Sequence, residues 1–317
     1  MTRRPSPPLR RSPSRRCRHS GPRIRASARY CRARPRARRS PKDRQTGREV
    51  DTLVIESPQN QQVKRLRSLV TRKGRRAAGR FLVEGTRALE EAASGHLPLE
   101  TVALCPELFS GDRAAELAGE LRGREVPILE LSEQAFRSFS QVQAPEGIAA
   151  EVGIPQTQLN DLPGDADLIV AAVDVRDPGN MGSLIRTADA AGAAAVIATG
   201  SCVDLFDPKV VRATAGSIFH LPVVNGAAPE DTIAWARRVG MRSVAATLQR
   251  AKPYTQTRFA KRTLVMVGNE ANGLRDDVAK RADIRAFIPM PGRAESLNVS
   301  VAAGILIWEI LRQRSGG

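Results

Sequence analysis

Several residue patterns that mark common classes of enzyme are missing from this sequence. It has only three histidines in 317 residues, and neither His96 nor His220 stands beside a cysteine or a cluster of carboxylates. The four cysteines lie far apart and form no CxxC pair: Cys17, Cys31, Cys105 and Cys202. These absences argue against a histidine-based triad, a metal site and a disulfide framework. We therefore predict a protein of a reducing compartment with no bound metal.

The glycine-rich loops of nucleotide-binding enzymes are missing too. The nearest approach to a GxGxxG motif is Gly179-Asn-Met-Gly182, whose spacing is wrong, and no lysine follows a run of glycines as in a P-loop. A nicotinamide-dependent or ATP-dependent enzyme therefore has weak support. No stretch approaches the roughly 20 apolar residues that span a bilayer. We predict a soluble, cytoplasmic protein with no membrane partner.

The net charge of +17 is concentrated at one end of the chain. Residues 1–48 hold 18 of the 50 Lys and Arg residues but one of the 33 Asp and Glu residues, so the remainder is neutral. Because this segment has few aliphatic side chains to bury, we expect residues 1–49 to be a disordered basic tail. Two interpretations stay open: an arm that binds RNA phosphates, or a segment outside the working protein, whose chain would begin near Val50.

A second basic run follows this tail. The stretch from Ser57 begins with a helical pattern at Val63, Leu66 and Val70 and is expected to end in a positively charged loop. The basic residues of this run are Arg72, Lys73, Arg75, Arg76 and Arg80. Because the rest of the body is charge-balanced, contact with an RNA backbone and an ordinary solvated surface both explain the run.

Short apolar runs alternate with helical patterns over residues 81–152. Predicted helices end at Gly95 and Gly123, and a third is expected to be capped by Ser132. The alternation predicts a small α/β domain over residues 50–153. Residues 154–166 carry two prolines and a glycine without periodicity, which predicts a linker.

Residues 167–317 show the same alternation on a larger scale. The run 167–175 is apolar enough for a strand buried on both faces. Further strands are predicted over 194–200, 218–224, 242–248 and 262–268. We therefore predict an α/β domain with a mainly parallel sheet. Ligands bind beyond the carboxyl ends of such strands, where three polar loops are expected to converge on one pocket: 176–186, 268–275 and 289–298.

The last of these loops leads into a long apolar segment with helical spacing from Val299. Either Ser296 or Asn298 sits where the N-cap of this helix belongs. Polar groups would then be fixed at the positive end of a buried helix, next to a loop rich in proline and glycine. This arrangement predicts a binding site for a small polar ligand.

Three blocks of this sequence resemble the ordered motifs of a known enzyme family. The blocks Asn180-Met-Gly-Ser-Leu-Ile-Arg186, Gly268-Asn-Glu270-Ala-Asn-Gly273 and Ile288-Pro-Met-Pro-Gly-Arg-Ala-Glu-Ser296-Leu-Asn298 look like motifs one, two and three of the SpoU (TrmH) class of SPOUT RNA ribose 2′-O-methyltransferases. The resemblance covers residues 168–312, and residues 57–152 are similar to the substrate-binding domain often fused ahead of them. It implies a trefoil-knotted, parallel-sheet α/β methyltransferase domain, S-adenosyl-L-methionine as cofactor, and a homodimer whose sites are completed by the partner.

The resemblance also implies roles for single residues. The family's catalytic positions fall on Asn180, Arg186, Glu270, Ser296 and Asn298. Its cofactor-binding positions fall on Thr247, Leu248, Gly268, Ile288, Met290 and Leu297.

Arg186 has two interpretations. If its helix begins near Met181, its charge lies on the second turn of an otherwise apolar stretch, where an ion pair with Asp177 or Asp189 would explain it. A guanidinium that faces the pocket and grips a phosphate explains it as well. The family is thought to use this arginine as a base, but a guanidinium is effectively always protonated. Binding of the adjacent phosphate, with the proton leaving through phosphate, water or Ser296, is an equally good account.

A fused N-terminal domain is typical of family members that act on ribosomal RNA, so we favour 23S rRNA as the substrate. A tRNA 2′-O-methyltransferase and a non-catalytic RNA-binding protein with the same fold remain alternatives. Because the body is neutral, recognition is expected to depend on local basic segments such as 72–80 and on RNA shape.

Overall fold

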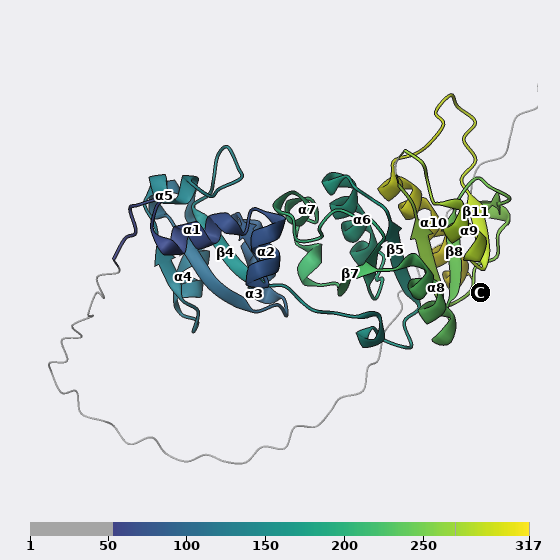
Figure 1. Ribbon diagram of the computed structural model, residues 1–317, viewed down its shortest axis with the longest axis horizontal. Helices are drawn as coiled ribbons and strands as arrows, with labels where there is room; N and C mark the ends of the chain where they lie inside the picture. Colours follow the sequence, from purple (N-terminus) through teal and green to yellow (C-terminus); the bar gives the residue numbers. More distant parts are fainter. Residues whose placement is uncertain (1–52, 270, 317) are drawn as a thin grey trace, which may run out of the picture. The chain divides into compact units, whose positions relative to one another are not determined.

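The computed structural model describes residues 53–269 and 271–316 (Figure 1). The expected basic tail over 1–49 and the catalytic candidate Glu270 lie outside the described residues. Within those ranges, a four-stranded sheet and then a seven-stranded sheet follow one another along the chain. The first uses strands between residues 80 and 153, and the second uses strands between residues 168 and 287.

The first sheet is mixed, with the strand order β1-β4-β2-β3. Its strands are β1 (Arg80–Glu84), β2 (Leu99–Leu104), β3 (Ile128–Glu130) and β4 (Ile148–Gly153). β4 pairs antiparallel with β1 and β2, whereas β2 and β3 are parallel. Along β1 the side chains alternate: Phe81 and Val83 join one apolar cluster and Leu82 joins another. Both faces of this sheet are therefore covered.

The described helices of this domain are α1 (Gln61–Ser68), α2 (Arg72–Ala78), α3 (Thr86–Ser94), α4 (Asp112–Arg122) and α5 (Glu133–Arg137). All except α2 provide that cover. Helices α3 and α4 share the cluster of Phe81, and α1 and α5 share that of Leu82. The three predicted helix boundaries are confirmed, with Gly95 and Gly123 as C-caps and Ser132 accepting a hydrogen bond from the Ala135 N–H.

The second sheet is entirely parallel, in the order β7-β6-β5-β10-β8-β11-β9. Its strands are β5 (Leu168–Val173), β6 (Val196–Thr199), β7 (Val223–Ala227), β8 (Arg242–Ala246), β9 (Lys252–Pro253), β10 (Thr263–Val267) and β11 (Ile284–Phe287). Every residue of β5 is buried. The predicted parallel sheet and its doubly buried first strand are confirmed.

Helices cover both faces of this sheet, which gives three layers (Figure 1). They are α6 (Pro178–Ala190), α7 (Pro208–Ala213), α8 (Pro229–Arg238), α9 (Asp276–Arg281) and α10 (Val299–Ser315). The Val170 side of β5 shares a cluster with α6, α7 and α10, and the Ile169 side shares one with α8 and α9. The described helices include none with the length and apolar character needed to cross a membrane.

Three local expectations are wrong. The basic run begins as a helix, α2, because Thr71 caps its first turn and the left-handed Gly79 (φ 62°) ends it. The strand expected over 218–224 begins only at Val223, since Ser217–Phe219 forms a turn of 3₁₀-helix whose side chains are buried. Helix α6 begins at Pro178 instead of near Met181, because Asp177 accepts the Asn180 N–H as an N-cap.

Candidate active site

A cavity of about 500 Å³ lies where the strands β8, β10 and β11 end and α10 begins. These are the carboxyl ends of parallel strands, the edge at which open α/β sheets bind ligands. The six predicted cofactor residues all border this cavity: Thr247, Leu248, Gly268, Ile288, Met290 and Leu297. Three separate stretches of sequence therefore meet around one space.

Gly268 stands where a tight loop folds back on the end of β10. A β-carbon at this position would lie 2.2 Å from the Leu274 nitrogen and 2.3 Å from the Gly273 carbonyl carbon. The loop closes through two backbone hydrogen bonds, Asn269 N to Gly273 O (3.0 Å) and Gly273 N to Asn269 O (2.8 Å). Only glycine allows this close approach, so one wall of the cavity is made of backbone.

Asn269 organises the same loop, and the sequence analysis missed it. Its Oδ1 accepts the N–H groups of Ala271 (2.9 Å) and Asn272 (3.3 Å). Its Nδ2 donates to the Asp174 carbonyl at 2.9 Å, at the end of β5. Asp174 has a left-handed backbone (φ 57°). A glycine and an asparagine after a buried strand form a turn signal that could have identified it.

The N-cap of α10 is Asn298 and not Ser296. Its Oδ1 accepts the N–H groups of Ser300 (2.9 Å) and Val301 (3.4 Å), whereas Ser296 is exposed and borders the cavity. Its Nδ2 donates to the Asn180 Oδ1 at 2.6 Å. Two predicted catalytic residues 118 positions apart are thus held together by one side-chain contact.

Arg186 is exposed on α6, and it forms no hydrogen bond or ion pair with any residue in the described ranges. Asp177 caps α6 instead, and the Asp189 carboxylate lies 3.8 Å from His220 Nδ1. The ion pair considered from the sequence is therefore not formed within the described part of the chain. Because α6 begins at Pro178 and not near Met181, Arg186 lies on the third turn of the helix and not on the second.

Arg186 borders a second hollow of about 470 Å³ between α6 and α10. Val301 and Trp308 also line it, and each is 50% exposed. We expected loop 176–186 to share one pocket with the other two loops. Within a single chain this expectation is wrong, because none of residues 176–186 borders the 500 Å³ cavity at the ends of β8, β10 and β11. Asn180 and Asn298 line neither hollow, but their contact joins the first turn of α6 to the N-cap of α10.

Comparisons with known proteins identify the family. The sequence profile of the SpoU rRNA methylase family matches residues 167–308, and that of the MRM3-like substrate binding domain matches residues 60–150. The 23S rRNA (guanosine(2553)-2′-O)-methyltransferase RlmP of Bacillus subtilis is 34% identical over 81% of this chain and 98% of its own length. This chain belongs to the SpoU rRNA methylase family.

Other SpoU relatives agree in fold but differ in target. The 23S rRNA (uridine(2479)-2′-O)-methyltransferase of Streptomyces viridochromogenes is 32% identical over 78% of this chain and 88% of its own length. The AdoMet-bound rRNA methyltransferase of Sinorhizobium meliloti has a TM-score of 0.73 and 32% identity over 82% of this chain and 98% of its own. Since one named target is a guanosine and another a uridine, membership of the SpoU family does not fix the base.

The basic run of this SpoU protein is not one continuous exposed surface. Arg72, Lys73 and Arg76 are exposed, but Arg75 is only 1% exposed and forms ion pairs with acidic residues of the second domain. The prediction that Arg75 contacts RNA is therefore wrong, because the guanidinium is buried and each of its nitrogens is bonded to a protein group. Arg80 is half-buried and paired with carboxylates of its own sheet.

Neither a metal site nor a reactive cysteine is found among the described residues. They contain no group of His, Cys, Asp and Glu placed to hold a metal ion. Burial raises the pKa of the Cys202 thiol to about 11 and also raises that of Cys105. Both thiols are therefore protonated near neutral pH and are poor nucleophiles.

Proposed function

We propose that this protein transfers a methyl group from S-adenosylmethionine to a ribose 2′-hydroxyl of 23S rRNA. The observation that carries the proposal is the single cavity at the carboxyl edge of the parallel sheet, bordered by all six family cofactor positions. The names of the relatives support the substrate and the position of the methyl group, and the AdoMet-bound structure of a relative supports the cofactor.

The cavity suits a ligand with both polar and apolar parts. Its volume of about 500 Å³ is typical of small-molecule sites. Backbone groups of Gly268 and its loop border it on one side, and the exposed side chains of Leu248 (63%) and Leu297 (36%) border it elsewhere. Such apolar groups gain burial when a ligand covers them. When bound, S-adenosylmethionine supplies a methyl group that its sulfonium has already activated.

The protein's own residues then mainly need to align the ribose hydroxyl. Asn180 and Asn298, held together at 2.6 Å, are suited to orient the ribose and the cavity loop. Arg186 is suited to hold the adjacent phosphate, because a guanidinium stays protonated and cannot act as a base. The proton leaves through that phosphate, water or Ser296, and we assign Glu270 a role in positioning these partners.

A homodimer explains why Arg186 and the cofactor cavity lie in different hollows of one chain. The hollow between α6 and α10 combines Arg186 with the half-exposed Val301 and Trp308. Two copies that pair through this surface would bury both apolar side chains and complete each site with residues of the partner. Trp308→Asp should then sediment as a monomer, and Leu248→Asp, which removes an exposed apolar side chain at the cavity, should remain a dimer. A dimeric Trp308→Asp would contradict this arrangement.

The remaining assignments follow from the family. We propose residues 50–153 as the RNA substrate-binding domain, residues 154–166 as the linker and residues 167–317 as a knotted methyltransferase domain of a cytoplasmic enzyme. The knot is supported by the match to the SpoU rRNA methylase family, whose resemblance implies it.

Methyl transfer to two unmodified transcripts tests the function and its main alternative. With labelled S-adenosylmethionine, the 23S transcript should be labelled and a tRNA transcript should not. Label in tRNA alone would favour the tRNA enzyme. Cofactor binding without label in any RNA would favour a non-catalytic RNA-binding protein.

A further inference from the structure

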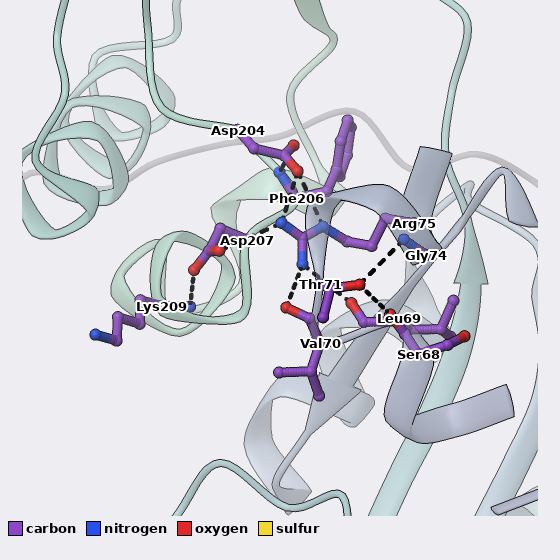
Figure 2. Close-up of polar contacts among 10 residues, drawn as sticks. All are labelled: Ser68, Leu69, Val70, Thr71, Gly74, Arg75, Asp204, Phe206, Asp207 and Lys209. Carbon is purple, nitrogen blue, oxygen red and sulfur yellow. Dashed lines mark hydrogen bonds and ion pairs between the residues drawn. The ribbon is translucent and has the colours of Figure 1, made fainter. Parts of the chain in front are cut away.

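One buried arginine connects the N-terminal domain to the methyltransferase domain (Figure 2). The Nε and Nη2 atoms of Arg75 donate to Asp204 Oδ2 at 2.9 Å and 2.7 Å, and Nη2 lies 3.3 Å from Asp207 Oδ2. Its Nη1 donates to the carbonyls of Leu69 (3.0 Å) and Val70 (2.8 Å), just after α1. The guanidinium therefore binds both domains at once, and its planar fork fixes the direction of each bond.

Both acidic partners of Arg75 are themselves held in place. Asp204 Oδ1 accepts the Phe206 N–H at 3.1 Å, and Asp207 Oδ1 accepts the Lys209 N–H at 3.0 Å as the N-cap of α7. The Phe206 ring also packs against Phe81 of β1, with 4.9 Å between the ring centroids. The contact thus has one defined geometry, unlike a solvent-exposed ion pair between two mobile side chains.

Helix α7 carries this connection on to the helix of the proposed catalytic residues. A β-carbon at Gly182 of α6 would lie 2.4 Å from the Ala213 β-carbon and 2.9 Å from the Val210 carbonyl oxygen of α7. The two helices are therefore in backbone contact, without a flexible side chain between them. Helix α6 also carries Asn180 and Arg186.

Two other arginines of α2, Arg72 and Arg76, are exposed and, being four residues apart, share one face of the helix. Together with Arg75 they line a cleft of about 240 Å³ between the domains. The other walls of this cleft include linker residues 154–158 and Asn225 of β7. If an RNA phosphate binds in this cleft, its distance from Arg186 depends on how the two domains are oriented, and the Arg75 contact fixes that orientation.

We propose that Arg75 is a positioning residue that sets which nucleotide of the bound RNA reaches the active site. This inference rests on the proposed function. All three guanidinium nitrogens of Arg75 are bonded to protein groups, so it acts by fixing the orientation of the substrate-binding domain against α7 and α6. A purely structural role would lower the amount of folded enzyme but would leave the methyl group on the same nucleotide.

The test compares full-length variants on the 23S transcript. Arg75→Met removes the contact, Arg75→Lys keeps the charge without the fork, and Asp204→Asn weakens the contact from the other side. Arg113→Met is the matched control, because this exposed arginine pairs with Glu90 inside the N-terminal domain. The measurements are kcat/KM, S-adenosylmethionine affinity, melting temperature and a map of 2′-O-methylated positions.

We expect Arg75→Met to lower kcat/KM by about 10- to 100-fold, the effect of a small misplacement of substrate. Cofactor affinity should stay within about twofold, and part of the product should move to neighbouring nucleotides. Asp204→Asn should misplace the methyl group in the same way, and Arg75→Lys should be intermediate, so the test does not depend on Arg75→Met folding. Arg113→Met should match the wild type.

The inference is overturned if the folded variants methylate only the wild-type nucleotide, whether at the wild-type rate or at a rate that falls only in proportion to folded protein. The failure of the proposed function is a separate result, because the wild-type protein itself would then transfer no methyl group to RNA.

Discussion

Replacing Gly268 by alanine should weaken S-adenosylmethionine binding about 30-fold or more. The new β-carbon would lie 2.2 Å from the Leu274 nitrogen and 2.3 Å from Gly273, all of it backbone that no rotamer change can move aside. Ordinary contact begins near 3.4 Å, so the loop must open by more than 1 Å. That movement breaks the two Asn269–Gly273 hydrogen bonds of 3.0 Å and 2.8 Å.

The magnitude follows from those two bonds. Each hydrogen bond stabilises the closed conformation of the loop by about 1 kcal/mol. Loss of both makes the closed conformation about 2 kcal/mol less stable than the open one, so it is populated about one time in 30. The observed dissociation constant rises by the same factor, since 1.4 kcal/mol is about tenfold. Titration calorimetry of the wild type and Gly268→Ala measures it directly.

Gly292→Ala is the matched control for this change. It lies in the loop that leads to α10, and a β-carbon there would meet nothing within 4 Å. We expect its cofactor affinity to be unchanged. If Gly268→Ala binds S-adenosylmethionine as tightly as the wild type, the loop after β10 is not a wall of the cofactor site.

Three further changes test other parts of the account. Arg186→Ala should lower kcat by about 100-fold or more with little change in cofactor affinity, measured by single-turnover kinetics and calorimetry; equal losses in both would refute a role confined to substrate. Asn298→Asp keeps the oxygen that caps α10 but removes the donor to Asn180, so kcat should fall while the melting temperature changes little; a wild-type kcat would show that the contact is dispensable. Burial alone would raise the pKa of the Asp283 carboxyl, but hydrogen bonds from the Ser243 N–H and hydroxyl and nearby arginine charges lower it below its usual range. Its stabilisation is therefore complete above the unfolded pKa of about 4 and is lost as the pH falls through the lower folded value. Urea unfolding should thus show Asp283→Asn less stable than the wild type at neutral pH, with the gap closing in acid; a gap independent of pH would refute this.

The sequence predicted the layers of the fold well, because local patterns determine them. The run over 167–175 reads as a doubly buried strand, and β5 is completely buried. Glycine and serine signals placed the ends of three helices correctly. Because parallel strands end at one edge, the loops around Gly268 and Ile288 could be predicted to meet, and both border the cavity.

The errors arise where distant contacts outweigh local pattern. The apolar stretch 218–224 resembles a strand, but Ile218 and Phe219 pack into the core from a 3₁₀ turn. Arg75 resembles its exposed neighbours in sequence, and it is buried because it pairs with two aspartates 129 and 132 residues away. Likewise, no sequence pattern indicates that Arg186 borders a different hollow from the cavity.

The most direct test of the central claim is the chemical position of the transferred methyl group. The protein is incubated with labelled S-adenosylmethionine and unmodified 23S RNA, and the RNA is then hydrolysed in alkali. A 2′-O-methyl group removes the nucleophile that alkaline cleavage needs, so we predict that the label persists in an alkali-stable dinucleotide. Label found only in mononucleotides would mean methylation of a base and would contradict the account.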